Sequence, residues 1–390
     1  AGLYYYDSER TTGRFARFDE DLYNLLVPAL APFASALSGR GEVPSQLDHT
    51  SYAAFFHADW ALSDALSVTF GLRYTQDEKS VDWTQTNFPD DPATAAVLQA
   101  ATGLPLTQAP GALFGAVNSN FSGDRDEDDL APLLSVNYQI SDDTLIYGRY
   151  ARAAKSGGYN ADFMTNGLDF FEYDQETVDS FELGLKTTAF DEKVRLNIAL
   201  FEMQFEDYQV FQFLENSQGA TSLELTNAGE VTSSGVETEL TWIPVEQLRL
   251  LANATWLDSS YDEFENPGGG EPFSGNDLPY APELKYFLAA QYMLQLGDGS
   301  LTFDVDYTFV DDQFTDPANL EVDKIDSYSL IGARVAYAPG SGSWELAAWG
   351  RNLGDEEYAK VNNDNFLGTP RTVWGDPQLY GVTFTYFVGQ

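Results

Sequence analysis

The chain of 390 residues contains no cysteine, so it has neither a disulfide nor a thiolate centre. Its only histidines are His49 and His57, and the G-x-S-x-G, H-E-x-x-H and phosphate-loop motifs are missing. We therefore expect no enzyme, no cofactor and no resident metal site. His57 shares the parity of Asp59, which is typical of a solvated histidine on a polar strand face rather than of a catalytic one.

Basic residues are scarce: 20 Lys and Arg stand against 61 Asp and Glu, which gives a formal net charge of −41. Because phosphate backbones are held by clustered Lys and Arg, this balance argues against nucleic acid as a partner. The acidic stretch GDRDEDD, Gly123 to Asp129, lacks the glycine and the distal glutamate of an EF-hand loop. We expect solvated loop carboxylates there rather than a calcium site.

Long apolar runs are also missing. The longest, LLVPALAPFASAL from Leu25, is broken by Pro28 and Pro32 and falls short of the roughly 20 residues that a membrane-spanning helix needs. The first residues, AGLYYYDSER, show no basic segment followed by an apolar core, so no secretory signal is visible.

Alternation with a period of two residues dominates the chain. In LSVTFGLRYTQ, Leu66 to Gln76, one parity is apolar and the other is polar, and LTFDVDYTFV from Leu301 and LYGVTFTYF from Leu379 repeat the pattern. Such alternation is typical of strands with one apolar and one polar face. No amphipathic helical pattern competes with it, so the sequence predicts an all-β chain.

The links between these strands alternate in length. Tight turns are predicted near residues 63, 141, 190, 244, 297 and 339, and long loops over Ser8 to Thr50, Glu78 to Leu130, Lys155 to Thr177, Phe211 to Leu223, Ser259 to Glu283, Gln313 to Asp326 and Leu353 to Gln378. Tight turns on one rim and long loops on the other are typical of bacterial outer-membrane barrels. The sequence thus predicts a transmembrane antiparallel β-barrel with about 14 strands, its apolar parity toward lipid and its polar parity toward the lumen.

Aromatic residues near the predicted strand ends favour the same interpretation. They lie on or close to the apolar parity, as residues of a girdle at the membrane interface should. The alternative is a core of aromatic residues in a large soluble β domain. The residues concerned are Trp60, Tyr74, Trp242, Trp256, Tyr292, Trp344 and Tyr386.

Five stretches resemble the barrel of TonB-dependent outer-membrane receptors: FFHADWALSDALSVTFGLRYTQDEKS, LLSVNYQISDDTLIYGRYARAAKSGGYN, YDQETVDSFELGLKTTAFDEKVRLNIALFEMQFEDYQVFQF, TNAGEVTSSGVETELTWIPVEQLRLLANATWLD and WELAAWGRNLGDEEY. The resemblance runs from Gly2 to the C-terminus and implies a 22-stranded barrel, an N-terminal plug domain and contact with the TonB complex. The chain departs from it by having about 14 strands and no plug, and by ending in VGQ after Phe387. We interpret residues 1–390 as the C-terminal portion of such a barrel.

Candidate substrate contacts lie in two long loops, where aromatic faces stand beside polar groups. A loop that merely packs on itself explains the same residues equally well. The candidates are Phe163, Phe170, Phe171 and Tyr173 in the first loop and Phe366, Arg371 and Trp374 in the second.

Charged residues on the polar parity are expected to face the lumen. The resemblance implies that they contact the plug, although hydration and pairing between strands would explain any single one. They are Arg73, Glu237, Glu239, Asp304 and Asp306. Most of the acidic excess is expected in the loops and the lumen, where it would either attract a cationic substrate or serve only solubility.

The resemblance implies TonB-coupled uptake of a scarce or bulky substrate, such as a siderophore, metal chelate, cobalamin or glycan, across the outer membrane of a Gram-negative bacterium. The expected partners are the TonB complex, the lipid bilayer with lipopolysaccharide, and the substrate. Two alternatives stay open: a passive porin or complete 14-stranded transporter, and a soluble all-β binding or structural protein.

Overall fold

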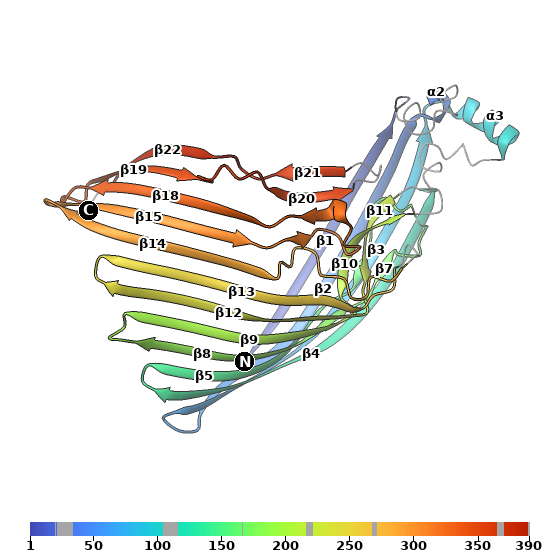
Figure 1. Cartoon of the computed structure of the whole chain (residues 1–390). Helices are drawn as coiled ribbons and strands as arrows, with labels where there is room; N and C mark the ends of the chain where they lie inside the picture. Colours follow the sequence, from blue (N-terminus) through green and yellow to red (C-terminus); the bar gives the residue numbers. More distant parts are fainter. Residues whose placement is uncertain are drawn as a thin grey trace.

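The computed structural model describes residues 1–19, 21, 34–103, 116–165, 167–215, 221–266, 271–364 and 370–388. Fourteen antiparallel strands form one sheet in which successive long strands are neighbours (Figure 1). The strands are β1 Gly2–Phe18, β2 Gly39–Ala61, β3 Leu66–Pro89, β4 Ser119–Ser141, β5 Thr144–Lys155, β8 Glu176–Ala189, β9 Val194–Glu206, β12 Glu230–Val245, β13 Leu248–Glu263, β14 Leu284–Leu296, β15 Gly299–Val310, β18 Tyr328–Ala338, β19 Trp344–Arg351 and β22 Leu379–Tyr386.

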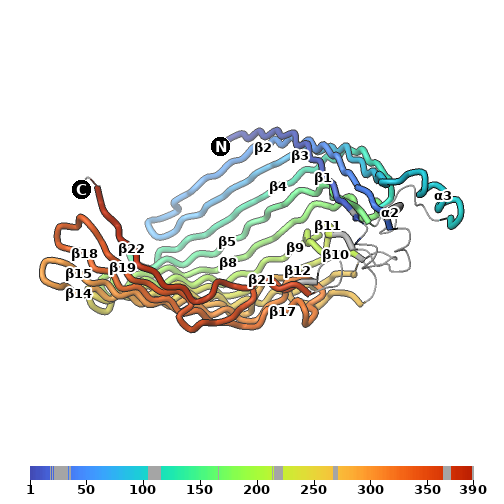
Figure 2. Tube along the Cα trace, turned by 90° about the horizontal axis from the view of Figure 1, so that it is seen from above, coloured from blue at the N-terminus to red at the C-terminus, as the bar shows by residue number. Residues whose placement is uncertain are grey.

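The sheet is bent into an arc, with β1 at one edge and β22 at the other (Figure 2). Within the described residues, each of these two strands pairs with one neighbour only, β2 and β19 respectively. The predicted all-β, antiparallel, barrel-like fold and its strand number are confirmed. No helix in the described ranges is long and apolar enough to cross a membrane.

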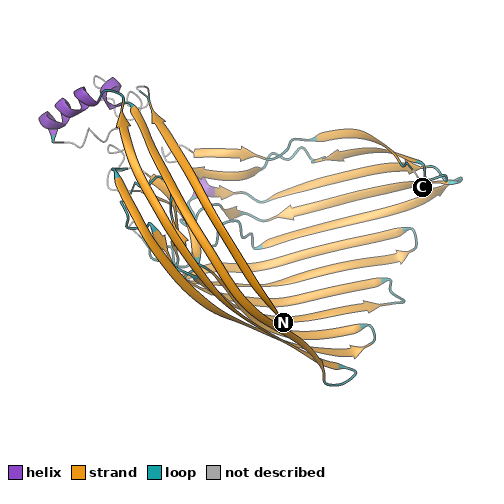
Figure 3. Cartoon of the chain, turned by 180° about the vertical axis from the view of Figure 1, so that it is seen from behind, coloured by secondary structure: helices purple, strands orange, loops and turns teal. Residues whose placement is uncertain are grey.

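The two ends of the strands differ in their connections, as predicted. Tight turns join strands at one end, and at the other end the long connections form small elements of their own (Figure 3). These are α2 Ala34–Leu37, α3 Pro92–Thr102, the 3-10 helix η4 Glu321–Asp323 and four two-stranded pairs: β6 Gly158–Tyr159 with β7 Glu172–Tyr173, β10 Gln209–Glu215 with β11 Thr221–Asn227, β16 Gln313–Phe314 with β17 Lys324–Ile325, and β20 Ala359–Asp364 with β21 Pro370–Trp374.

The predicted boundaries of the first two long loops are wrong. Residues assigned to the loops Ser8 to Thr50 and Glu78 to Leu130 instead extend β1 to Phe18, begin β2 at Gly39, extend β3 to Pro89 and begin β4 at Ser119. In these extensions the buried side chains lie on the face that carries polar side chains in the middle of the strand. In β3, for example, Val81 and Trp83 lie on the same face as Arg73. The alternation continues in the extensions, but there the apolar side chains are on the inward face. The extensions therefore did not match the pattern expected of a membrane strand, and the sequence predicted loops.

The acidic stretch from Gly123 to Asp129 belongs to β4 and is not a loop. Its alternate aspartates, Asp124, Asp126 and Asp128, are exposed on the outward face, while Arg125 and Glu127 lie on the partly covered inward face. Because neighbouring residues of a strand point to opposite faces, the stretch divides into an outward acidic row and an inward polar pair.

The two faces of the sheet are assigned by register. In β15, Phe303 is exposed on the outward face, opposite Val335 of β18, and Asp304 is half-buried on the inward face, opposite Arg334. In several strands the outward face is apolar in the middle and acidic toward the long connections. The change occurs between Tyr74 and Glu78 in β3, between Leu130 and Asp128 in β4, between Leu200 and Glu202 in β9, and between Trp256 and Asp258 in β13. Part of the acidic excess therefore lies on the outward parity of the strands and not in the loops and the lumen, where the sequence predicts most of it.

Candidate functional site: the inward face and its loops

The connection between β5 and β8 folds onto the inward face of β2, β3 and β4 near the long connections, at what we call the upper ends of the strands. Phe171 is the centre of the contact, with its ring centroid 5.0 Å from Trp83, 4.7 Å from Phe121 and 6.0 Å from Tyr159. Burial of these large rings stabilises the loop against the sheet. The buried members of this first cluster are Val43, Val81, Trp83, Tyr159, Met164 and Phe171.

Polar contacts of Lys79, Arg125 and Glu127, here called the latch, hold the beginning of the same loop. Glu127 accepts a hydrogen bond from the backbone N–H of Gly157 at 2.8 Å, and Lys79 donates to Ser156 Oγ at 2.6 Å. Arg125 forms ion pairs with Glu127 at 2.5 Å and with Asp174 at 2.7 Å, so β4 holds the end of the loop through Arg125 and its start through Glu127. Burial lowers the pKa of Lys79, and the carboxylate of Glu127 opposes that shift.

Gly157 is required at this position because of the close approach. A Cβ at residue 157 would lie 2.4 Å from the carbonyl oxygen of Tyr173 and 2.7 Å from both Arg125 Nη2 and Glu127 Oε1. Sequence reasoning missed this latch. The signal was present in the stretch KSGGYN, in which two adjacent glycines come one residue after the end of the strand.

A second cluster covers the inward face beside β12 and β13. It contains Tyr261, which is fully buried, in edge-on contact with Tyr208 at 6.3 Å and tilted against Phe264 at 5.0 Å. Burial raises the pKa of Tyr261, which keeps its phenol protonated. Its buried members are Val210, Ala228, Val231, Tyr261, Phe264 and Leu278. Figure 2 shows β10 and β11 lying within the arc of the sheet.

The four aromatic candidates of the first loop have different positions. Phe171 is 1% exposed and anchors the loop, so it presents no free surface. The ring of Phe163 lies against Gly41 of β2, and Phe170 and Tyr173 are half-buried. Burial raises the pKa of the Tyr173 phenol. These placements agree with a loop that packs on the sheet, and substrate contact by Phe163, Phe170 and Tyr173 stays a prediction.

The second candidate set lies in the connection between β19 and β22. Arg371 and Trp374 are exposed in β21, with 64% of Trp374 accessible, and Phe366 lies outside the described residues. The partner strand β20 is fixed to the β15–β18 connection, because Asn362 Nδ2 donates to the carbonyl oxygen of Lys324 at 2.5 Å. Contact of this set with a substrate also stays a prediction.

The charged residues predicted on the polar parity all lie on the inward face. Asp304 accepts hydrogen bonds from Gln291 at 2.8 Å and from Arg334 at 3.4 Å, and Arg334 also bridges to Glu345. Glu239 accepts a hydrogen bond from Asn197 at 3.0 Å. Asp306 lies against the backbone of Gly332, where a Cβ would clash with its carboxylate, and Glu237 and Arg73 share the inward parity. Contact with a plug domain stays a prediction.

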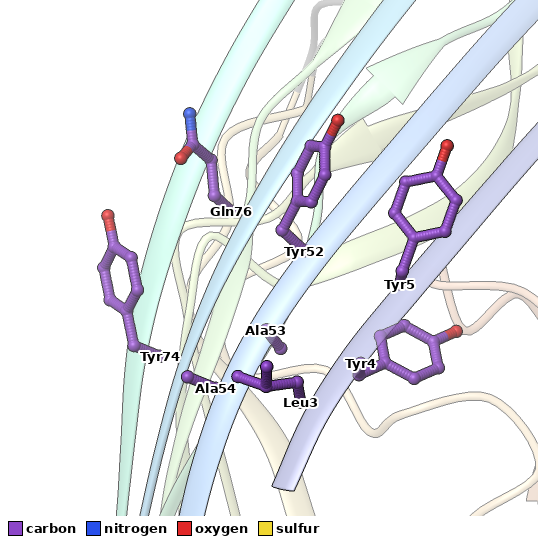
Figure 4. Close-up of a pocket in the computed structure, with 8 residues that line it drawn as sticks. All are labelled: Leu3, Tyr4, Tyr5, Tyr52, Ala53, Ala54, Tyr74 and Gln76. Atoms are coloured by element: carbon purple, nitrogen blue, oxygen red, sulfur yellow. The ribbon is translucent and has the colours of Figure 1, made fainter.

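On the outward face, a shallow groove lies over the first three strands. It is lined by Leu3, Tyr5, Tyr52, Ala54 and Tyr74, and the three tyrosine hydroxyls lie on the same side of their rings in Figure 4. Tyr5 and Tyr52 are tilted against each other with centroids 5.3 Å apart. An apolar groove edged by hydroxyls is the arrangement that suits a lipid–water interface.

No group of three or more potential metal ligands forms within the described ranges. The arrangement offers a sheet with an apolar outward band, a polar inward wall and packed loops at one rim. A bent sheet of this kind can enclose a polar molecule on its inward side.

Comparison with known proteins gives a consistent result. The sequence model "TonB dependent receptor-like, beta-barrel" matches residues 2–353. The chain is 26% identical over 232 residues to the pesticin receptor of Yersinia enterocolitica, and the match covers 59% of the chain and 28% of the relative. The pesticin receptor of Yersinia pestis matches over the same shares. The chain thus spans less than a third of the length of these relatives.

Solved structures agree on the fold. The ferric yersiniabactin uptake receptor of Yersinia pestis superposes with a TM-score of 0.68 at 18% identity, over 98% of this chain and 55% of that one. A siderophore receptor of Acinetobacter baumannii gives a TM-score of 0.61 at 18% identity, over 89% and 43%. Since the family model covers most of the chain, the chain belongs to the TonB-dependent receptor-like β-barrel family.

Proposed function

We propose that this chain is the membrane barrel of an outer-membrane receptor that takes up a scarce metal chelate with energy from the TonB complex. Members of the family are transport receptors rather than enzymes. The observation that carries the proposal is the sheet itself, which has an apolar outward band, a polar inward wall and loops packed over one rim. A siderophore-type chelate is favoured over a cobalamin or a glycan because relatives are a pesticin receptor and receptors for iron chelates.

The two free edges of the sheet support a longer barrel. Backbone N–H and C=O groups along β1 and β22 have partners on one side only within the described residues, and an unpaired edge is costly in lipid. We propose that further strands of the same receptor close the barrel and that a plug fills it, which gives the inward charges a partner. The work for uphill uptake then comes from the inner membrane through TonB, because the outer membrane has no energy source.

The length proposal is tested by the intact mass of the protein extracted from its own membrane. We expect several hundred residues more than the 43.1 kDa of this chain accounts for. A mass near 43.1 kDa would instead support the alternative of a complete 14-stranded passive barrel.

The transport proposal is tested by uptake of radioactive iron supplied as a panel of ferric siderophores. Cells that carry the receptor should accumulate the label from at least one chelate, and they should lose this uptake when TonB is deleted. Uptake that persists without TonB, together with steady ion conductance of the receptor in planar bilayers, would replace the proposal with a passive porin.

A further inference from the structure

Arg73 on the inward face of β3 is held between two aromatic rings. Its guanidinium carbon lies 5.2 Å from the ring centroid of Tyr4 and 5.9 Å from that of Phe55. Phe55 is the direct partner of Arg73 on β2, and Tyr4 of β1 stands opposite Ala53. The Nε atom of Arg73 donates to Thr75 Oγ1 at 3.0 Å. Two cation–π contacts and one hydrogen bond therefore orient this side chain.

No carboxylate of the described residues forms an ion pair with Arg73, although the sequence has three times as many acidic as basic residues. Three arginines of the sheet, Arg125, Arg152 and Arg334, each bind at least one carboxylate. Several others form no ion pair among the described residues, and Arg73 differs from them in lying against two aromatic rings. On β4 the residue opposite Arg73 is Ala131, and the next inward carboxylate, Asp129, stands opposite Thr75. The surroundings of Arg73 thus provide rings and small side chains but no bound anion.

This geometry leaves the binding edge of the guanidinium available. Its terminal nitrogens have no acceptor among the residues that the structure describes, and Nε is already used by Thr75. A guanidinium presents its N–H groups in its own plane, in a fork that matches the two oxygens of a carboxylate. The rings of Tyr4 and Phe55, 44% and 41% exposed, position the cation without burying it.

We propose that Arg73, Tyr4 and Phe55 form a carboxylate-binding subsite on the inner wall of the barrel. The occupant is a carboxylate group, held in the guanidinium plane by the terminal N–H groups of Arg73. Such a group exists on an organic chelator, and it also exists on acidic side chains elsewhere in the receptor. The subsite does not depend on the uptake proposal, because it follows from the inward face alone.

Crystals of the complete receptor, grown with and without 4-iodobenzoate, distinguish these two sources. A carboxylate of the receptor itself within about 3 Å of the Arg73 terminal nitrogens would identify an internal occupant. Iodine anomalous density beside Arg73, with the probe carboxylate on its terminal nitrogens, would identify a site for ligands. A guanidinium bound to neither, at probe concentrations that fill other sites, overturns the proposal.

Where the probe occupies the site, matched variants give a second test by calorimetric titration of 4-iodobenzoate. We expect R73Q to weaken binding at least tenfold and R73K to recover only part of the loss, because a lysine lacks the planar fork. The control R351Q removes an inward arginine that lies over a single ring, Trp349, at 5.3 Å, and it should change the affinity less than twofold. Equal affinities for R73Q and R351Q would rule out the subsite. A receptor that binds the probe but transports no iron would remove the uptake proposal and leave the subsite intact.

Discussion

At the scale of single residues, the loop after β5 depends on a glycine and a ring. Gly157 allows its own backbone N–H to reach Glu127, and Phe171 fills the space between Trp83 and Phe121. One residue removes a steric obstacle, and the other supplies apolar area. Neither role was evident from the sequence, because each depends on a partner residue at least 30 positions away along the chain.

The substitution Gly157→Ala is expected to open the latch. The added Cβ would meet the carbonyl of Tyr173 at 2.4 Å, so the loop must shift and lose the bond to Glu127. We expect a loss of about 1–3 kcal/mol and faster hydrogen exchange over residues 156–175. Gly148→Ala is the control, because nothing lies within 4 Å of a Cβ at that position. Similar exchange rates in both variants would argue against the latch.

The substitution Phe171→Ala separates anchoring from ligand contact. Removal of a fully buried ring should lower the free energy of unfolding by about 3–5 kcal/mol, or release the loop to proteases while the sheet stays folded. Phe170→Ala, at the half-buried neighbour, should cost much less. Limited proteolysis followed by mass mapping measures both. Equal protection of the loop in wild type and Phe171→Ala would contradict the anchoring role.

At the scale of elements, each strand carries different chemistry on its two faces and at its two ends. In β15 the outward face is apolar and the inward face carries Asp304 and Asp306. In the first half of β3 the apolar side chains face outward. In its second half the apolar side chains Val81 and Trp83 face inward and pack in the first cluster. A strand of this kind is in effect two consecutive segments, one matched to lipid and one matched to packed loops.

Substitutions on the two faces of β15 test this sidedness. Phe303→Arg should destabilise the barrel by about 2–4 kcal/mol if the residue lies near the bilayer midplane. Asp304→Asn should cost less, since it keeps the shape of the side chain and the bond from Gln291 while it weakens the pair with Arg334. Asp304→Arg is a poorer probe because it would place two cations together. Denaturant unfolding in lipid vesicles gives both values, and equal losses would contradict the assignment of the two faces.

At the scale of the whole molecule, the formal charge of −41 is unevenly distributed. Acidic rows follow the outward faces above the apolar band, whereas the inward face mixes signs, as in the group of Asp304, Arg334 and Glu345. Fields from exposed carboxylates fade over roughly 8–10 Å at ordinary salt concentrations. We therefore expect the outward acidic rows to hydrate the exterior rather than to attract a cationic substrate.

Binding kinetics across an ionic-strength series tests this distribution. We expect the association rate of a ferric chelate with the purified receptor to change little with salt, because the nearest inward charges are of both signs. A steep fall of the rate with rising salt for a cationic ligand would show that the outward acid steers the substrate.

The sequence by itself determined the all-β class, the number of long strands, the order of tight turns and long links, and which parity faces outward. These properties follow from a period of two residues and from turn composition, which are local and therefore visible along the chain. The aromatic residues Trp60, Trp242 and Trp256 were placed on the outward face by the same parity.

Only the tertiary structure decided where the upper strands end, that Phe171 is an anchor, that Gly157 closes a latch, and that Arg73 lies between Tyr4 and Phe55. Each of these depends on which residue of another strand or loop stands opposite. That pairing is set by the register of the sheet and by loops that fold back onto it, and both bring together residues that are distant in sequence.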